Sequence, residues 1–236
     1  MVETRNKLLV VAAHPDDEVL GCGATVALRV ASGWEAHLLI MATGIAGRFA
    51  DVEKHAEEIG QRVAELDGHI GMVAKILGFC SHKRLDFPDN RLDVTPRQDL
   101  VHAILPLIEE IKPRLVLTHH PGDYNWDHGH VFDAVMMAAR RSPGEVGPAE
   151  IMTFEVPSST ERGRRDPEAA FHPNVFINVE KTIDKKKLAM RHYESEYRDY
   201  PHPRSIEGIE YWARKRGLEV GLGYAEAFHL IRRVEE

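Results

Sequence analysis

A chain of 236 residues with 43% hydrophobic and 28% charged side chains has the composition of a folded globular protein, which excludes disorder, collagen and coiled coil as descriptions of the whole chain. The formal net charge of −7 argues against nucleic acid as a partner. A chain of this length buries a sizeable core without disulfides, so we expect a single domain over residues 1–236.

Cysteine usage and hydropathy indicate where such a chain would work. Two cysteines, Cys22 and Cys80, are too few for a disulfide framework, which favours a reducing compartment and a cytoplasmic location. The apolar run near the start is too short for a signal peptide, and no run reaches the roughly 18 apolar residues that a membrane helix needs. We therefore expect no transmembrane segment; a homo-oligomer is compatible with the sequence.

The first 141 residues alternate between short apolar runs and amphipathic segments that end at glycine or proline, a pattern that predicts buried parallel strands joined by helices. In chain order we expect strand Leu8–Ala13, helix Asp17–Ser32, strand Ala36–Ala42, helix Asp51–Asp67, strand Val73–Gly78, helix Pro96–Ile111, strand Leu115–Thr118 and helix Val131–Arg141. This order predicts an α/β fold, a Rossmann-like three-layer sandwich with a mostly parallel sheet.

The last third of the chain is less regular. We expect strands at Ile151–Val156, Val175–Val179 and Ala225–Ile231, helices at Glu180–Tyr197 and Ile206–Gly217, and loops at Ser158–Asp166 and Tyr200–Ser205. The Lys185–Lys187 run is typical of a solvated helix face.

Polar clusters follow three of the expected strands. They are His14–Glu18, Thr43–Arg48 and His119–His130. Because doubly wound sheets bind ligands at the carboxyl ends of their strands, we expect these clusters to meet in one site.

The first cluster has the composition of half a metal site. His14 and Asp17 are three residues apart across a turn that Pro15 restricts, so both side chains can face one point. Imidazole nitrogen and carboxylate oxygen are both good zinc ligands. Asp16 must point elsewhere and could act as general base on a water. Alternatively, the acidic residues only complement the dipole of the next helix.

A catalytic zinc usually has three protein ligands, and the third must come from another segment. The His119–His130 segment ends the fourth expected strand at the same sheet edge and offers four histidines. Each has a simpler explanation as well. His119 and His120 can cap the strand, His128 and His130 can be solvated helix residues, and Asp127 can be a helix N-cap.

The residues of both clusters match a known family. Ala-His-Pro-Asp-Asp-Glu at 13–18, with Gly-Asp-Tyr-Asn-Trp-Asp-His at 122–128, resembles the PIG-L/LmbE-like family of zinc-dependent N-acetylglucosaminyl deacetylases. The likeness extends to residues 78–91 and to the loop at 200–205, and it covers nearly the whole chain. It implies one zinc ion per chain, held by His14, Asp17 and His128, with His130 as the alternative third ligand, and Asp16 as general base.

One position departs from the family pattern. Asn125 stands where many members have a histidine that assists the oxyanion or the leaving group. Asparagine can donate a hydrogen bond but cannot carry a proton, so we expect a different acid, and His202 in the Pro-His-Pro loop is the candidate. Alternatively, His202 is a surface residue of a turn. Asp127 is expected to orient a neighbouring imidazole.

The resemblance implies a hydrolase that removes an N-acetyl or other N-acyl group from an amino sugar or its conjugate. The first alternative is a metal-dependent amidase acting on another N-acylated small molecule or on a thiol conjugate. The second is a non-catalytic nucleotide-binding module. The Gly-Cys-Gly at 21–23 supports the latter poorly, since a third glycine is missing and three carboxylates precede it; these glycines are better explained by tight packing of a helix on the sheet.

Substrate contacts are expected at the rim of the site. Arg48 follows the second strand, and Asp89 and Arg91 lie in a Phe-Pro-Asp-Asn-Arg turn. Carboxylate and guanidinium groups suit sugar hydroxyls, which makes these three residues the candidates for substrate binding. Alternatively, the Pro-Asp-Asn sequence only forms the turn.

Overall fold

A computed structural model describes residues 6–45, 49, 51, 53–141, 147–164 and 166–235. Its centre is a seven-stranded sheet with strand order β3-β2-β1-β4-β5-β7-β6. The strands are β1 (Lys7–Ala12), β2 (Glu35–Ala42), β3 (Ser81–Phe87), β4 (Leu115–His119), β5 (Glu150–Phe154), β6 (Val175–Asn178) and β7 (Ala225–Arg233). Strands β1 to β5 pair in parallel, and β7 runs antiparallel to both β5 and β6.

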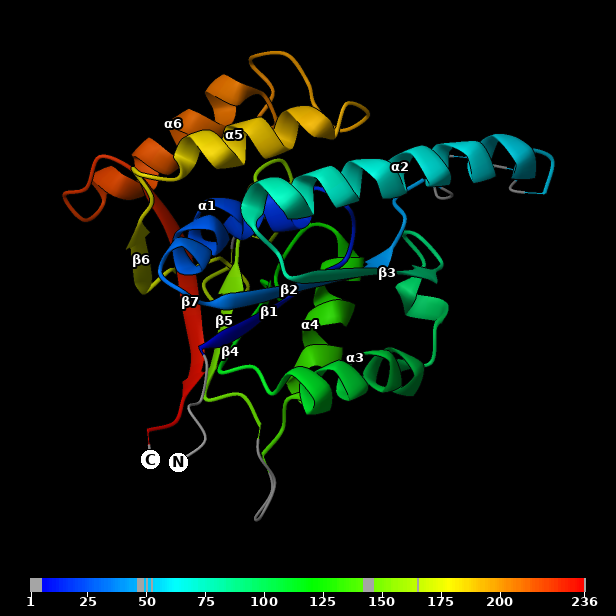
Figure 1. The fold of residues 1–236 in the computed structure, drawn as a ribbon, viewed down its shortest axis with the longest axis horizontal. Coiled ribbons are helices and arrows are strands. Elements are labelled where there is room, and N and C mark those ends of the chain that lie inside the picture. Colours follow the sequence, from blue (N-terminus) through cyan, green and yellow to red (C-terminus); the bar gives the residue numbers. More distant parts are fainter. Residues whose placement is uncertain are drawn as a thin grey trace.

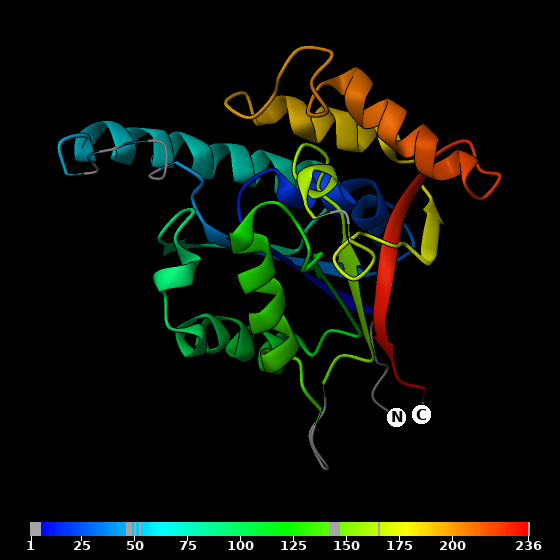
Figure 2. The same cartoon turned by 180° about the vertical axis from the view of Figure 1, so that it is seen from behind.

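Helices cover both faces of this sheet. They are α1 (Asp17–Ala31), α2 (Ala56–Leu77), α3 (Arg97–Ile111), α4 (Trp126–Ala138), α5 (Ile183–His192) and α6 (Ile206–Leu218). Figure 1 shows α1, α2, α5 and α6 on one face, and the opposite view in Figure 2 shows α3 and α4 together on the other. The predicted three-layer α/β sandwich with a mostly parallel sheet is confirmed.

Alternation along β1 divides the core into two. Leu8 and Val10 belong to the cluster under α1, α2, α5 and α6, while Leu9 and Val11 belong to the cluster under α3 and α4. Successive side chains of a strand point to opposite faces, so a strand between two helix layers must be apolar throughout. This explains why the Leu-Leu-Val-Val run marks the centre of the sheet.

The prediction of a strand at Val73–Gly78 is wrong, because this segment is the last turn of α2. Its buried residues lie at helical spacing on one face of the helix: Leu66, Ile70, Val73, Ala74 and Leu77. Gly78 ends the helix in the left-handed conformation, with φ of 88°. The third strand is β3, an edge strand whose polar sequence Ser-His-Lys-Arg-Leu-Asp-Phe carries no hydrophobic signal.

Two other helix bounds differ from the sequence prediction. Helix α4 begins at Trp126 rather than Val131, because the Asn125 side chain caps it by accepting a hydrogen bond from the backbone N–H of Asp127. Asp127 and His128 therefore lie in its first turn. Helix α5 is shorter than predicted and ends at His192, which leaves Tyr193 just beyond the helix.

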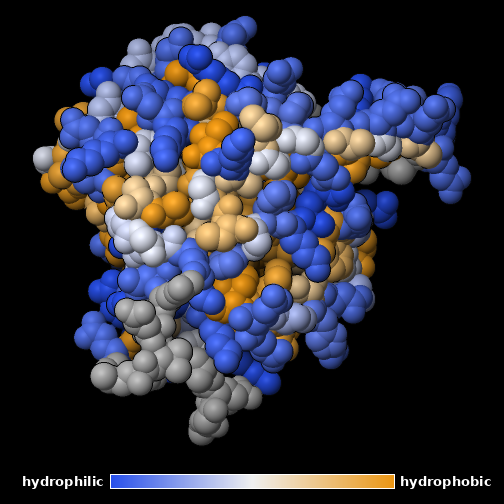
Figure 3. All heavy atoms as spheres, viewed as in Figure 1, coloured by the Kyte–Doolittle hydropathy of each residue, from blue (hydrophilic) through white to orange (hydrophobic). Residues whose placement is uncertain are grey.

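The first turns of α2 extend away from the sheet in Figure 1 and are covered mainly by hydrophilic side chains in Figure 3. This agrees with the exposure of Glu57, Glu58 and Arg62. None of the helices in the described part of the chain is both long and apolar enough to cross a bilayer.

Candidate functional site

A cavity of about 140 Å³ lies beyond the carboxyl ends of β1 and β2. The described residues that line it are His14, Pro15, Asp16, Asp17, Thr43, Gly44, Ile45, Leu66, Asp89, Asn90, Asn125, His128, Ser159, Ser195, Glu196 and Arg204. The polar ends of two strands thus meet where a parallel sheet places ligands. This cavity brings together the two sequence motifs at 13–18 and 122–128.

Three buried side chains in this cavity have the arrangement of metal ligands. His14, Asp17 and His128 each offer one ligand atom, and these atoms lie within 4.8 Å of one another. Oδ2 of Asp17 is 3.5 Å from Nδ1 of His14 and 3.4 Å from Nε2 of His128. Ligand atoms of a tetrahedral zinc site, each about 2.1 Å from the metal, lie roughly 3.4 Å apart. The donor set and its spacing therefore fit a small divalent cation.

Carboxylates contact the other nitrogen of each imidazole in this cluster. Nε2 of His14 is 3.0 Å from Oδ2 of Asp127 and 3.2 Å from Oδ1 of Asp89. Asp127 also accepts the backbone N–H groups of Asn90 at 2.8 Å and Leu92 at 3.1 Å. This fixes the carboxylate against His14, so Nε2 can donate to it while Nδ1 faces Asp17. Such carboxylate–histidine pairs orient metal ligands and raise their basicity.

His128 is supported in the same way by a residue from its own motif. Nδ1 of His128 lies 3.2 Å from Oδ1 of Asp123. Asp123 in turn accepts hydrogen bonds from the hydroxyls of Ser159 and Thr160 and from the backbone N–H of Asn125. The loop after β5 is thereby tied to the candidate metal ligand.

His119, one of the four histidines of this segment, packs beneath the site. Its ring stacks on that of His128 with centroids 3.9 Å apart, and its Nε2 accepts the backbone N–H of Ala13 at 2.8 Å. Burial lowers the pKa of His119 to about 3, which agrees with a neutral ring that accepts a hydrogen bond. His119 therefore holds the strand end that carries the first motif.

The ionisable groups of the cluster are strongly coupled. Burial alone would lower the pKa of His128, but Asp17 and Asp123 outweigh it and raise that pKa to about 9. Burial would raise the pKa of Asp17, yet His128 and His119 hold it well below its usual range. Negative charge is concentrated around the two imidazoles. A cation bound there would take the place of the protons that the imidazoles otherwise hold.

Asp16 lies beside this cluster and faces a different partner. Its backbone adopts the left-handed region, with φ of 99°, and its N–H donates to Oε2 of Glu18 at 3.1 Å. Oδ2 of Asp16 is 2.9 Å from Nη1 of Arg204. Burial raises the pKa of Asp16 well above its usual value, although Arg204 opposes the shift. A buried carboxylate with raised basicity suits a general base.

The other residues predicted to take part in catalysis are placed differently. Asn125 lines the cavity, where its carbonyl oxygen caps α4 and its amide nitrogen lies 3.4 Å from Oδ1 of Asn90. His202 does not line the cavity; its Nδ1 accepts the backbone N–H of Arg204 at 3.1 Å, and burial, together with Arg204, lowers its pKa. Arg204, two residues further on, reaches the site instead.

The candidates for substrate binding also separate. Asp89 is 3% exposed and lines the cavity, in contact with His14. Arg91 is exposed and does not line it. Arg48 lies outside the described residues. Two groups of described side chains could hold a metal ion, namely His14–Asp17–His128 and His14–Asp89–Asp127. His130, the alternative third ligand, is half-buried and belongs to neither.

Sequence reasoning missed four residues that shape the site. Arg204 and Asp123 lie inside motifs that the sequence analysis singled out, so their position was a usable signal. Glu18 was noted only as an acidic residue, and Tyr193, whose hydroxyl donates to Oε1 of Glu18 at 2.6 Å, carried no signal at all.

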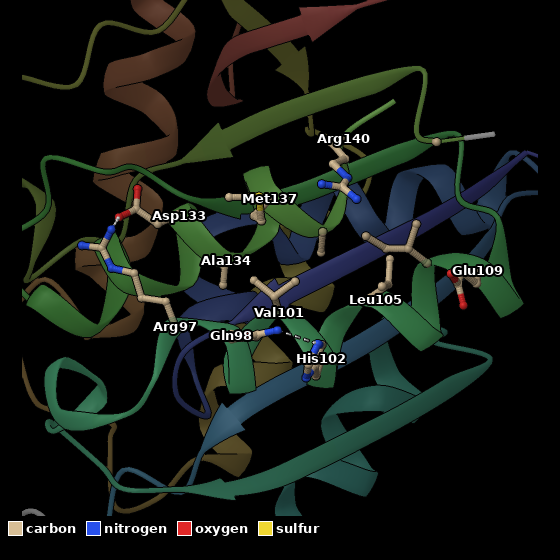
Figure 4. Close-up of a pocket in the computed structure, with 13 residues that line it drawn as sticks. Arg97, Gln98, Val101, His102, Leu105, Glu109, Asp133, Ala134, Met137 and Arg140 are labelled. Atoms are coloured by element: carbon tan, nitrogen blue, oxygen red, sulfur yellow. Dashed lines mark hydrogen bonds and ion pairs between the residues drawn. The ribbon is translucent and has the colours of Figure 1, made fainter. Parts of the chain in front are cut away.

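A larger cavity, of about 690 Å³, lies between α3 and α4, the two helices that cover one face of the sheet. Figure 4 shows Val101, Leu105, Ala134 and Met137 in it, with charged side chains such as Arg140 around them. Neither of the candidate metal clusters of the described residues lies there. Chemistry rather than size therefore makes the smaller cavity the candidate functional site.

Curated proteins with similar sequences are named as deacetylases. The chain is 29% identical over 190 residues to a protein of Escherichia coli named "Uncharacterized deacetylase YaiS", a match that covers 78% of this chain and 88% of the relative. It is 31% identical over 165 residues to the 1D-myo-inositol 2-acetamido-2-deoxy-alpha-D-glucopyranoside deacetylase of Mycolicibacterium smegmatis. That match covers 60% of this chain and 56% of the relative, so it spans just over half of the longer enzyme.

Solved structures share the fold at lower identity. The N,N'-diacetylchitobiose deacetylase of Pyrococcus horikoshii superposes with a TM-score of 0.76 at 18% identity, covering 97% of this chain and 85% of the other. GalB, a 4-carboxy-2-hydroxymuconate hydratase of Pseudomonas putida, reaches 0.73 at 24% identity and covers 98% of both chains. A deacetylase and a hydratase on one fold mean that the reaction must be argued from the site.

The family assignment is based on the half of the chain that carries both motifs. The model of the family described as GlcNAc-PI de-N-acetylase matches residues 9–139, which include both motifs and the carboxylates around them. The chain therefore belongs to the PIG-L family of GlcNAc-PI de-N-acetylases.

Proposed function

We propose that the chain is a metal-dependent hydrolase that removes an N-acetyl group from an amino sugar or amino-sugar conjugate. The observation that carries this proposal is the convergence of His14, Asp17 and His128 with a separate buried carboxylate, Asp16, in one cavity. Metal ligands with an adjacent base are what metal-assisted hydrolysis of an amide requires, and a binding module has no need of the base.

Zinc is the metal we propose, one ion per chain. Two imidazoles and one carboxylate form a ligand set typical of catalytic zinc, which leaves a coordination position for water or substrate. When bound, the ion would acidify a water molecule and polarise the scissile carbonyl. Asp127 and Asp123 would keep His14 and His128 oriented toward it through the contacts described above.

The protein's own residues account for the movement of protons. Asp16 would accept a proton from the attacking water, and the departing amine nitrogen must gain one before the C–N bond breaks. Asp16 can return its proton to that nitrogen, or His202 can supply one if the loop at 200–205 brings it to the substrate. The amide N–H of Asn125, which lines the cavity, would donate to the developing oxyanion.

The size of the cavity and the names of the relatives support the substrate class. A volume of about 140 Å³ suits the acetamido group and leaves the sugar and its aglycone outside. Two of the relatives are named for acetamido-glucopyranoside and diacetylchitobiose substrates. Asp89 is the candidate that lies in the cavity for contact with the substrate, while Arg91 and Arg48 remain candidates for its outer part.

The test is release of acetate and free amine from a panel of N-acetylated sugars and conjugates, using protein analysed for zinc content. Asp16→Asn should lower kcat by about 100-fold or more while zinc content is unchanged, as expected for removal of a general base. Asp133→Asn, which changes an exposed carboxylate beside the larger cavity, is the matched control and should keep full activity. Turnover by Asp16→Asn near the wild-type rate would contradict the assignment of the base.

A further inference from the structure

A single guanidinium holds the side chain of Asp16 at the cavity. Arg204 lies in the loop between α5 and α6, and its side chain is only 24% exposed. Its Nη1 is 2.9 Å from Oδ2 of Asp16 and 2.9 Å from Oε2 of Glu196. Its Nε donates to Oγ of Ser158 at 2.8 Å.

These three partners come from three separate loops. Asp16 follows β1, Ser158 follows β5, and Glu196 follows α5. Asp16, Glu196 and Arg204 line the cavity directly, and Ser158 adjoins the lining residue Ser159. The planar guanidinium donates hydrogen bonds to Ser158 and Glu196 in a fixed geometry and forms an ion pair with Asp16, whereas the ammonium of a lysine is a point charge on a flexible stem.

Asp16 needs such support because its own backbone is not in a favoured conformation. A non-glycine residue with φ of 99° is held there only by its surroundings, and the Glu18 carboxylate that accepts the Asp16 N–H supplies part of that restraint. It acts on the backbone and leaves the side chain free to rotate. Arg204 is the group that contacts the carboxylate itself.

We propose that Arg204 is a positioning residue for Asp16, a role that rests on the proposed function of Asp16 as general base. By contacting Oδ2, Arg204 fixes the plane of the carboxylate and leaves Oδ1 to take the proton. Glu196 and Ser158 hold the guanidinium in turn. The loops after β5 and α5 therefore determine how the Asp16 carboxylate is oriented in the cavity.

The experiment compares Arg204→Lys and Arg204→Ala with the wild type in kcat, KM, zinc content and thermal unfolding. Since a displacement of about 1 Å can cost about 100-fold in rate, we expect kcat to fall by about 10- to 100-fold in both variants, with KM and zinc content close to the wild-type values. Added methylguanidinium at millimolar concentrations should restore kcat of Arg204→Ala in a saturable manner, and it should not affect Arg204→Lys.

Arg216→Lys is the matched control. Arg216 also forms a buried two-point pair, with both oxygens of Glu155 at 2.6 Å, but it does not line the cavity. It should lose thermal stability and keep its kcat.

Three results would overturn the proposal: wild-type kcat in Arg204→Lys, a rise in KM with unchanged kcat, or no rescue of Arg204→Ala by methylguanidinium. Absence of any turnover by the zinc-loaded wild type would instead overturn the proposed function, so the two failures are distinguishable.

Discussion

The hydroxyl of Tyr193 donates a hydrogen bond to Oε1 of Glu18 at 2.6 Å, and both side chains are fully buried. Glu18 uses its second oxygen to accept the backbone N–H of Asp16. A residue just after α5 therefore restrains, through one carboxylate, the turn that carries the proposed base. The pair links the C-terminal third of the chain to the site built by the family-matched segment.

Replacement of Tyr193 by phenylalanine should test this link. The change removes the hydrogen bond to a buried carboxyl group, so we expect the free energy of unfolding to fall by about 1–3 kcal/mol. Urea unfolding of both proteins measures it. Tyr224→Phe is the control, because its hydroxyl donates to Glu210 in a partly exposed pair at 3.1 Å and its loss should change stability by less than about 0.5 kcal/mol. Equal effects of the two substitutions would contradict the structural role of the Tyr193–Glu18 pair.

Glu18 should also make stability depend on pH. Burial raises its pKa from 4.5 to about 7, so between these values the folded protein keeps a proton that the unfolded chain has lost. Below pH 4.5 the raised pKa of Glu18 does not lower the free energy of unfolding. As pH rises from 4.5 toward 7 it lowers the free energy of unfolding increasingly, by up to about 3 kcal/mol.

Glu18→Gln should remove this dependence, since the amide does not titrate: its oxygen can still accept the Asp16 N–H, while its NH2 group can donate to the Tyr193 oxygen. The measurement is urea unfolding of the metal-free protein at several pH values between 4.5 and 8. The difference in stability between variant and wild type should grow in favour of the variant as pH rises through this window. A constant difference would show that Glu18 does not titrate there.

Which strands could be predicted from the sequence depends on how deeply each strand is buried in the sheet. Strands β1, β2 and β4 are largely buried, and each contains an apolar run, at 8–12, 38–42 and 115–117, so their positions were predictable. Strand β3 is at the sheet edge, and its polar sequence resembles a loop, while the apolar end of α2 resembles a strand. A short apolar run alone does not distinguish a strand from a buried helix turn.

The site divides in the same way. His14 and Asp17 converge across three residues of local chain, which spacing alone can indicate. Arg204 meets Asp16 and Tyr193 meets Glu18 only after the sheet has brought distant segments together. A polar residue in a loop has no periodicity that marks its partner, so these contacts could not be read from the sequence.

The choice between His128 and His130 as the third metal ligand can be tested directly. Nε2 of His128 lies 3.4 Å from Oδ2 of Asp17, within the cluster, whereas His130 lies outside it. His128→Ala should therefore lose most of the bound metal, and His130→Ala should retain close to one ion per chain. Elemental analysis of protein purified without chelator or added metal gives both values. The reverse result would move the third ligand to His130.

Gly21 of the Gly-Cys-Gly at 21–23 allows close packing of α1, whereas a Cβ at Gly23 would make only ordinary contacts. A Cβ at Gly21 would lie 2.2 Å from Cδ2 of Phe154, because the ring of this last residue of β5 lies against α1. Gly21→Ala should lower the free energy of unfolding by about 1–3 kcal/mol, since a well-packed core must move to admit the methyl group.

Gly68→Ala is the matched change on α2, where nothing lies within 4 Å of the new Cβ, and it should raise stability by up to about 1 kcal/mol through helix propensity. The same substitution should therefore change the free energy of unfolding in opposite directions at the two positions, which urea unfolding measures. If both substitutions changed the free energy of unfolding in the same direction, contact with Phe154 would not be the reason for glycine at position 21. The Gly-Cys-Gly would then need another explanation.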